Sequence, residues 1–183
     1  MVRYLACTKL NLANEKLRFA RNEFWKPYLQ NNIMFKFNIS HSGAWVVCAI
    51  ADTEVGIDVE EIKPIDFSVS QCFFSKREHQ QLMMQREELR LAYFYNLWTM
   101  KESYIKCIGK GLSIPLNSFT VCVERQCVIA STDYPSIPVL MIDLEDQYKL
   151  SVCSMEHLAT SNIEVINISN VAEQLLWGIE KTR

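Results

Sequence analysis

The 183-residue sequence lacks the features that mark membrane proteins, nucleic-acid-binding proteins and secreted proteins. No apolar run approaches the roughly 18 residues that a membrane span requires. The formal net charge is only −2, so the chain has no electrostatic footprint for nucleic acid or an anionic membrane. The N-terminus has no signal-peptide pattern, because Arg3, Thr8 and Lys9 interrupt a very short apolar stretch. We therefore expect a cytoplasmic protein that binds neither nucleic acid nor a membrane.

The sequence also lacks the short motifs of common metal and nucleotide sites. Its seven cysteines are scattered and no CxxC pair occurs, so neither a zinc site nor a disulfide framework is supported. No Walker-type or GxGxxG loop is present, which gives no support to the ordinary nucleotide-binding folds. What the chain does have is an apolar content of 49%, enough for a real core in one large domain or two small ones.

The stretch WTMKESYIKCIGKG places charged side chains on a helix that also has a buried face. We expect this helix to span Glu87–Ile108 and to end at Gly109 in a left-handed cap. Apolar residues recur at helical spacing along its buried face, namely Tyr93, Leu97, Met100 and Tyr104. Trp98, Glu102 and Lys106 share another face, one turn apart from each other. Glu102 and Lys106 form either an exposed ion pair or part of a functional site.

A second acidic signal lies on a predicted strand, Val55–Glu61. Side chains alternate along a strand, so Asp58 and Glu60 point to the same face at a separation of about 6–7 Å. Two carboxylates this close either lie in open water or share a cation. Gly56 falls on that face as well, and we expect its missing side chain to leave space for a ligand beside the acids.

These two acidic segments together predict a metal site beside a phosphate site. Asp58, Glu60 and Glu102 offer carboxylate oxygens, the hard ligands that favour Mg²⁺. The remaining candidates are donors suited to phosphate: Lys26, Ser40, His41, Ser42 and Lys106. A metal together with amine, imidazole and hydroxyl donors is suited to moving or cleaving a phosphorylated group.

The rest of the chain is predicted as a mixture of helices and strands. In the first part we expect the tail of a helix and a turn at 11–19, a loop before Pro27, a strand at 35–40, a polar turn at 40–43 and a strand buried on both faces at 44–50. Further on we expect helices at 67–74 and 75–84, the second with a capping box made by Ser75 and Glu78. An extended loop at 114–117, hairpins at 119–131 and 139–154, a final strand at 163–168 and a short helix at 169–179 complete the prediction.

Several spaced motifs, taken together, resemble a known family. They are FNISHSG at 37–43, GIDVE at 56–60, FFS at 73–75, WTMKESYIK at 98–106, GKGL at 109–112 and PLNSF at 115–119. In this order and spacing they look like a 4′-phosphopantetheinyl transferase of the surfactin/gramicidin synthetase-activating type. The resemblance covers residues 1–155, and the chain after about residue 155 matches only loosely.

The resemblance implies a reaction and assigns roles by motif position. Such enzymes transfer the phosphopantetheine group of coenzyme A to a serine of an acyl or peptidyl carrier protein, which activates non-ribosomal peptide synthetases. Asp58, Glu60 and Glu102 would bind Mg²⁺ on the pyrophosphate, with Glu102 and Lys106 as the catalytic residues. The residues that would contact coenzyme A are Lys26, Ser40, His41, Asp58 and Lys106. The carrier protein would dock on the region from about 109 to 140.

The resemblance also implies an α+β fold of two pseudo-twofold-related halves, with the site between them. We expect residues 1–54 to be a truncated first half on the coenzyme A side, and residues 55–183 to be the second half with the metal site and docking surface. Trp25 stands where the family has a glycine before Lys-Pro. The alternatives are a weakly active or inactive remnant that only docks carrier proteins, and a generic metal-dependent phosphohydrolase. We expect a monomer, or self-association through apolar surface left exposed by the shorter first half.

Overall fold

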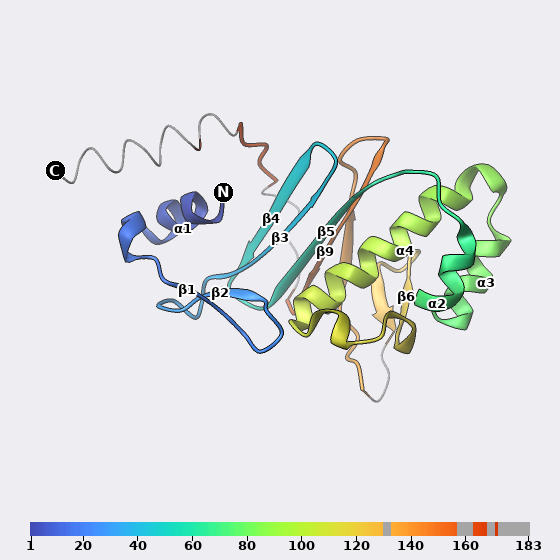
Figure 1. Ribbon diagram of the computed structural model, residues 1–183, viewed down its shortest axis with the longest axis horizontal. Coiled ribbons are helices and arrows are strands. Elements are labelled where there is room, and N and C mark those ends of the chain that lie inside the picture. Colours follow the sequence, from blue (N-terminus) through green and yellow to red (C-terminus); the bar gives the residue numbers. More distant parts are fainter. Residues whose placement is uncertain (130–132, 157–162, 168–170, 172–183) are drawn as a thin grey trace.

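The computed structural model describes residues 1–129, 133–156, 163–167 and 171, and these form an α+β fold (Figure 1). The α-helices of this part are α1 (Val2–Leu10), α2 (Ser70–Phe73), α3 (Lys76–Met84) and α4 (Glu87–Ile108). The strands are β1 (Phe19–Arg21), β2 (Pro27–Leu29), β3 (Lys36–Ser42), β4 (Trp45–Ala51), β5 (Val55–Glu61), β6 (Thr120–Cys122), β7 (Cys127–Ile129), β8 (Val139–Ile142) and β9 (Tyr148–Ser154). Short 3-10 helices lie at Asn14–Lys16, Phe67–Val69, Gly111–Ser113 and Leu116–Ser118. The expected α+β class is confirmed.

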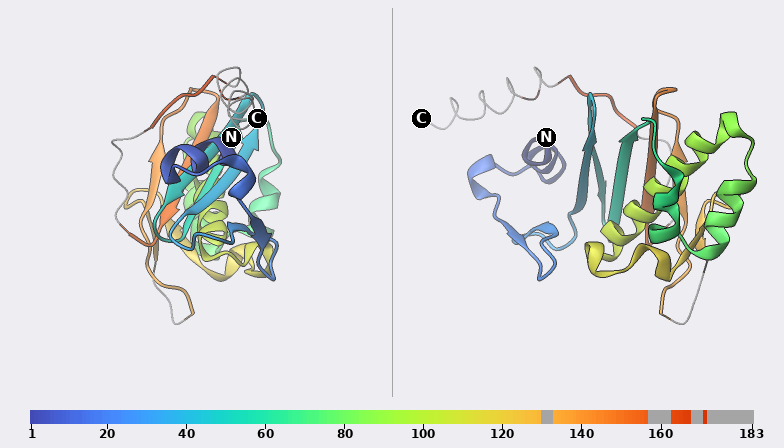
Figure 2. Two further views of the ribbon diagram at one scale, coloured as in Figure 1. Left: turned by 90° about the vertical axis from the view of Figure 1, so that its left-hand side faces the viewer. Right: turned by 45° about the vertical axis from the view of Figure 1, so that its right-hand side comes forward.

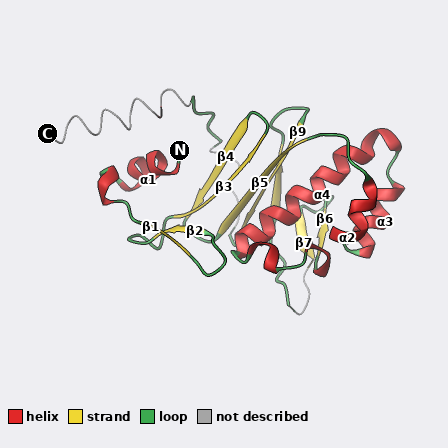
Figure 3. Cartoon of the chain, viewed as in Figure 1, coloured by secondary structure: helices red, strands yellow, loops and turns green. Residues whose placement is uncertain are grey.

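The strands form small antiparallel sheets, and one long helix packs on the three-stranded one. β5, β9 and β8 make a three-stranded sheet in the order β5-β9-β8, and β3 pairs with β4, β1 with β2 and β6 with β7. α4 lies across the β5 and β9 strands, and α2 and α3 gather beside it on the same side of the sheet (Figure 3). The β3–β4 hairpin lies between α1 and the three-stranded sheet (Figure 2). Among the described residues, no helix is long and apolar enough to span a membrane.

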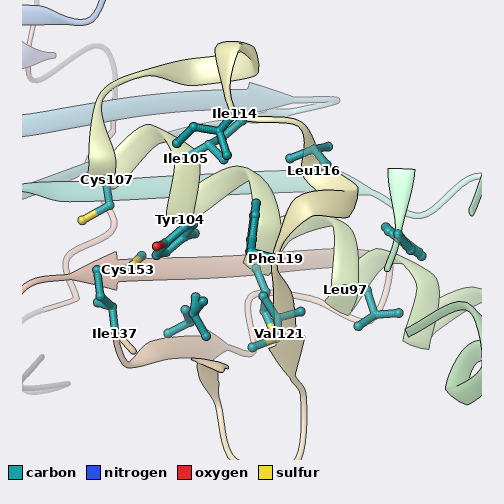
Figure 4. Close-up of a cluster of buried hydrophobic side chains, with 14 of the residues drawn as sticks. Leu97, Tyr104, Ile105, Cys107, Ile114, Leu116, Phe119, Val121, Ile137 and Cys153 are labelled. Carbon is teal, nitrogen blue, oxygen red and sulfur yellow. The ribbon is translucent and has the colours of Figure 1, made fainter. Parts of the chain in front are cut away.

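α4 forms over the predicted residues because its apolar positions repeat at helical spacing and both ends are favourable. Glu87 and Glu88 place negative charge in the first turn, where the helix dipole stabilises it. Gly109 ends the helix with a φ of 81°, and its N–H donates to the Ile105 carbonyl. The main hydrophobic cluster forms along this helix, and Tyr104 packs there against Phe119 at a ring-centroid distance of 4.7 Å (Figure 4). The helix is therefore held along its length by the core.

β3 is joined to β5 by side chains, although the two strands belong to different sheets. β5 is the edge of its sheet, so its outward backbone N–H groups need acceptors. The Asn38 side-chain oxygen accepts from Ile57 N–H at 2.9 Å, and the Ser42 hydroxyl accepts from Glu61 N–H at 3.0 Å. This polar seam fixes the face of β3 that carries Asn38, Ser40 and Ser42 against the acidic strand.

The first part of the chain differs from the sequence prediction in three places. The helix precedes Asn11, where a left-handed φ of 50° ends it, so the prediction of a helix tail at 11–19 was wrong. β3 continues to Ser42 and the turn comes at Gly43, with a φ of 54°, so the expected polar turn at 40–43 is mostly strand. Both faces of β4 contact apolar clusters, with Trp45 and Val47 on the side of the sheet and Cys48 and Ile50 on the side of α1, but these side chains are only partly buried. The prediction of a strand that packs on both faces is therefore confirmed, and the expected full burial was wrong.

The later elements follow the prediction more closely. The capping box of Ser75 and Glu78 is present, and both predicted hairpins form as β6–β7 and β8–β9. The expected extended loop at 114–117 instead enters a 3-10 turn at Leu116–Ser118. Residues 163–167 have no strand, so that prediction was wrong for the described part, and the helix expected at 169–179 lies outside the described residues apart from Val171. The pseudo-twofold relation and the division at residue 54 stay predictions.

Candidate active site between β5 and α4

Asp58 is the most deeply buried carboxylate of the candidate site. It lies in the middle of β5 and is only 2% exposed. Its Oδ1 accepts hydrogen bonds from the Ser40 hydroxyl at 2.9 Å and from the Lys106 ammonium at 2.5 Å. Its Oδ2 is also buried, and it has no hydrogen-bond partner among the described residues. A buried carboxylate oxygen without a partner is costly, which suits a position that receives a further ligand.

Glu60 and Glu102 extend the acidic site from its two sides. Glu60 follows Asp58 on the same face of β5, and its Oε2 accepts from the Ser42 hydroxyl at 2.9 Å. Glu102 comes from α4, one turn before Lys106, and is half-buried. The Glu60 carboxylate acts on both of the other acids, since it contributes to raising the pKa of each. The fold thus brings the acids of β5 and α4 together across one interface.

The surroundings favour the protonated forms of Asp58 and Glu102. Burial raises the pKa of Asp58 to about 7; the Lys106 ammonium opposes this and the Glu60 carboxylate adds to it. Burial also raises the pKa of Glu102, again opposed by Lys106 and assisted by Glu60. Burial is the largest cause of both shifts, so an added cation would favour the ionised form of each carboxyl.

Lys106 forms its ion pair with Asp58. An exposed pair along α4 would instead join Lys106 to Glu102. The Asp58 carboxylate is nearly inaccessible to water, so an ammonium beside it is less screened than one paired at the helix surface. The Lys106 ammonium also donates to the Ser40 hydroxyl at 3.3 Å. Lys106, Ser40 and Asp58 therefore form one hydrogen-bonded group, and the reading of Glu102 and Lys106 as a solvated surface pair was wrong.

Ser40 and His41 point to opposite sides of β3. Ser40 is buried against Asp58, whereas His41 is exposed, as alternation along a strand requires. The sequence prediction grouped the two residues as phosphate contacts in a polar turn. Because His41 belongs to a strand, only Ser40 faces the carboxylates, and the assigned role of His41 stays a prediction.

The Lys26 side chain is mostly buried, and its ammonium is bonded to the protein itself. Its ammonium donates to the Glu54 carboxylate at 2.7 Å, the Cys107 carbonyl at 3.1 Å and the Val55 carbonyl at 3.2 Å. The Cys107 carbonyl belongs to the last turn of α4, where a positive charge complements the helix dipole. All three N–H bonds of the ammonium are thereby used to join α4 to the start of β5, and its assignment as a phosphate contact stays a prediction.

Gly56 serves packing and not ligand space. A Cβ at this position would lie 1.9 Å from the Ser103 carbonyl oxygen and 2.4 Å from the Cys107 nitrogen. The backbone of α4 therefore rests directly on β5 at Gly56, and the expected gap beside the acids is filled by the helix. The close approach is what places Glu102 and Lys106 near Asp58.

The described residues contain no group of three or more His, Cys, Asp or Glu side chains arranged closely enough to hold a metal ion. The sequence prediction missed Asn38, and it listed Ser42 only as a phosphate donor; both residues hold β3 against the acidic strand. Their signal was present, because polar residues recur with the period of two at Asn38, Ser40 and Ser42. Trp98, on the same helix face as Glu102, packs against Phe73 at a ring-centroid distance of 5.6 Å.

A buried aspartate and a half-buried glutamate on a strand, faced by a glutamate and a lysine of a packed helix, make a site of the kind that group-transfer enzymes use for phosphorylated substrates. A family model described as the 4′-phosphopantetheinyl transferase superfamily matches residues 54–158, and one described as 4′-phosphopantetheinyl transferase, N-terminal, matches residues 1–53. The chain belongs to the 4′-phosphopantetheinyl transferase superfamily and is thus a transferase.

Three sequence relatives agree with this assignment. The 4′-phosphopantetheinyl transferase psf-1 of Bacillus pumilus is 37% identical over 96% of this chain and 76% of its own length. The corresponding enzyme gsp of Aneurinibacillus migulanus is 37% identical over 93% of this chain and 74% of its own, and Sfp of Bacillus subtilis is 39% identical over 84% and 70%. The holo-[acyl-carrier-protein] synthase of Thermotoga maritima, a solved structure, matches 55% of this chain and 61% of its own at a TM-score of 0.41 and 16% identity.

Proposed function

We propose that this chain is a cytoplasmic, Mg²⁺-dependent enzyme that transfers the 4′-phosphopantetheine group of coenzyme A to a serine of an acyl or peptidyl carrier protein. The carrier we propose is part of a non-ribosomal peptide synthetase. Membership of the 4′-phosphopantetheinyl transferase superfamily supports the reaction. The observation that carries the proposal is the buried Asp58 Oδ2, which has no partner among the described residues; the Glu60 carboxylate acts electrostatically on Asp58 and on Glu102.

The donor chemistry of the site suits a hard divalent cation, although the carboxylates of the described residues do not come together as a group of three around one point. Asp58 supplies an oxygen that still needs a partner, and burial keeps the pKa values of Asp58 and Glu102 above their ordinary values in the absence of added positive charge. We therefore assign the cation to Asp58, Glu60 and Glu102, whose oxygens are the ligand type that Mg²⁺ prefers. When bound, Mg²⁺ supplies charge stabilisation to the pyrophosphate of coenzyme A.

The side chains of α4 carry the proposed chemistry. Glu102 takes the proton of the carrier serine, directly or through water, and burial, which raises its pKa, makes it a stronger base than an ordinary glutamate. The serine oxygen forms the new bond to phosphorus as the bond to adenosine 3′,5′-bisphosphate breaks. Lys106, whose ammonium already contacts Asp58 and Ser40 at the edge of the site, stabilises the negative charge that develops on the phosphate oxygens.

Transfer is tested by weighing a carrier protein. An apo carrier protein is incubated with this chain, coenzyme A and Mg²⁺, and its mass is compared with that after incubation with a relative such as Sfp. We expect the mass of one phosphopantetheine group on the serine that Sfp modifies. An unmodified carrier in the presence of folded protein, when Sfp modifies it fully, would contradict the proposal and favour a remnant that only docks carriers.

A further inference from the structure

A fully buried ion pair lies on a side of α4 that the candidate active site does not use. The Lys101 ammonium is 2.9 Å from Glu78 Oε1, and neither side chain has any exposed surface. Replacing such a pair by well-packed apolar residues is often neutral or stabilising, so stability alone gives weak reason for its presence. Polar networks of this kind instead act by fixing one arrangement of the groups that they bond.

The pair bonds the backbone that follows α4. The Lys101 ammonium donates to the carbonyls of Leu116 and Phe119, each at 2.7 Å. Glu78 Oε1 accepts from the N–H of Val121, the middle residue of β6, at 2.7 Å. The ammonium also lies 4.1 Å from the centroid of the Phe119 ring. The two charged side chains are therefore satisfied mainly by main-chain atoms of one stretch.

We call residues 110–121 the tethered segment. Its inner side chains, among them Leu116 and Phe119, pack on the cluster beside α4 (Figure 4). Its outer surface carries Leu112, which is 74% exposed, next to the exposed Lys110. The segment thus presents an apolar residue and a cation to solvent, and it lies in the region proposed to receive the carrier protein.

We propose that the Glu78–Lys101 pair is a positioning device, which fixes the tethered segment relative to the active-site face of α4. This inference rests on the proposed function. Lys101 and Glu102 are consecutive on one packed helix, so the helix links the anchor of the segment directly to the proposed base. A displacement of about 1 Å between bound substrate and catalytic groups can cost about 100-fold in rate, so anchoring the carrier-binding surface to this helix has a direct kinetic consequence.

The test removes the tether and keeps the volume of the core. In the double variant Glu78→Gln, Lys101→Met, residue 101 can no longer donate to the two carbonyls, and residue 78 keeps one oxygen, which can accept from the Val121 N–H or from the Ser75 N–H of the α3 capping box but not from both. Leu82→Ala is the control, because Leu82 is fully buried on α3 and its loss weakens the same core without removing these hydrogen bonds. Amide hydrogen exchange and the two KM values, for carrier protein and for coenzyme A, are measured on both variants and on the unchanged chain.

We expect exchange in the tethered segment of the double variant to become at least about tenfold faster, relative to the rest of the protein. We expect KM for the carrier to rise about tenfold while KM for coenzyme A stays within about twofold. Equal changes in both KM values, or the same pattern in Leu82→Ala, would show a merely structural role and overturn the inference. So would unchanged exchange in the segment.

A variant that does not fold, or an unchanged chain that transfers nothing, also gives a clear result. If the double variant does not fold, Glu78→Gln alone is read in the same way; if neither folds, the pair supports the whole fold and the positioning role is wrong. If the unchanged chain transfers nothing, the proposed function fails, whereas the exchange measurement still decides whether the pair fixes the segment.

Discussion

Replacing Asp58 by asparagine should stabilise the metal-free protein while abolishing transfer. The buried Asp58 carboxyl has a pKa raised to about 7 from its ordinary value of 3.8, mainly because burial disfavours its charge. The folded protein therefore holds this proton more tightly than the unfolded chain does. The free energy of unfolding of the unchanged chain consequently falls as pH rises from about 4 to about 7. Asparagine cannot ionise, so the Asp58→Asn variant does not lose this stability.

The size of the effect follows from the two pKa values. Each difference of one in pKa corresponds to about 1.4 kcal/mol, so the Asp58 charge costs about 4 kcal/mol above pH 7. At pH 5 roughly 1–2 kcal/mol of this loss has already occurred, because the unfolded chain is then mostly ionised. The stability advantage of Asp58→Asn over the unchanged chain should therefore grow by about 2–3 kcal/mol between pH 5 and pH 8. For a chain of this length that is roughly 5–10 °C in melting temperature.

Thermal and denaturant unfolding in the presence of a chelator measure this difference, because a bound cation would offset the charge. Asp52→Asn is the control, since Asp52 is exposed and its pair with Lys9 is long at 3.5 Å. We expect the control to show no growth in stability between the two pH values. If the advantage of Asp58→Asn is the same at pH 5 and pH 8, or if the variant is the less stable protein at pH 8, the argument from burial is wrong.

Three more substitutions test the geometry around the acids. Gly56→Ala should cost about 1–3 kcal/mol in unfolding free energy or prevent folding, because its Cβ would meet the Ser103 carbonyl; an unchanged melting temperature would contradict the direct contact of α4 with β5. Gly109→Ala should cost about 1 kcal/mol, since the cap needs a left-handed φ, and chemical denaturation would reveal it. Lys106→Met should lower transfer by about 100-fold or more and raise the pKa of Asp58 above 7; near-normal transfer would remove Lys106 from the chemistry.

The parts of the fold that the sequence predicted are those with a strong local signal. The period of α4, the glycine at its end and the capping box of α3 each depend on residues close together in the chain, and all three form as expected. The alternation along β5 likewise places Asp58 and Glu60 on the same face. Local periodicity was sufficient for each of these elements.

What the sequence could not give depends on contacts between distant segments. Gly56 looked like free space because the approach of α4 to β5 is not visible in either segment alone. No local pattern predicted the partners of Lys101, because only the fold brings Glu78 and the carbonyls that follow α4 around its buried ammonium. The three acceptors that surround the Lys26 ammonium were likewise not visible in its own segment, and its assignment as a phosphate contact stays a prediction. In each case tertiary structure decided what a charged or small residue does.

The claim on which the rest depends is that carboxylates of β5 and α4 share one cation. Calorimetric titration of Mn²⁺ or Mg²⁺ in the presence of coenzyme A tests it, on the unchanged chain and on Glu102→Ala, with Glu88→Ala as an exposed control from the same helix. We expect one site in the unchanged chain and in the control, and an affinity at least about tenfold weaker in Glu102→Ala. Equal affinity in all three proteins would contradict the account.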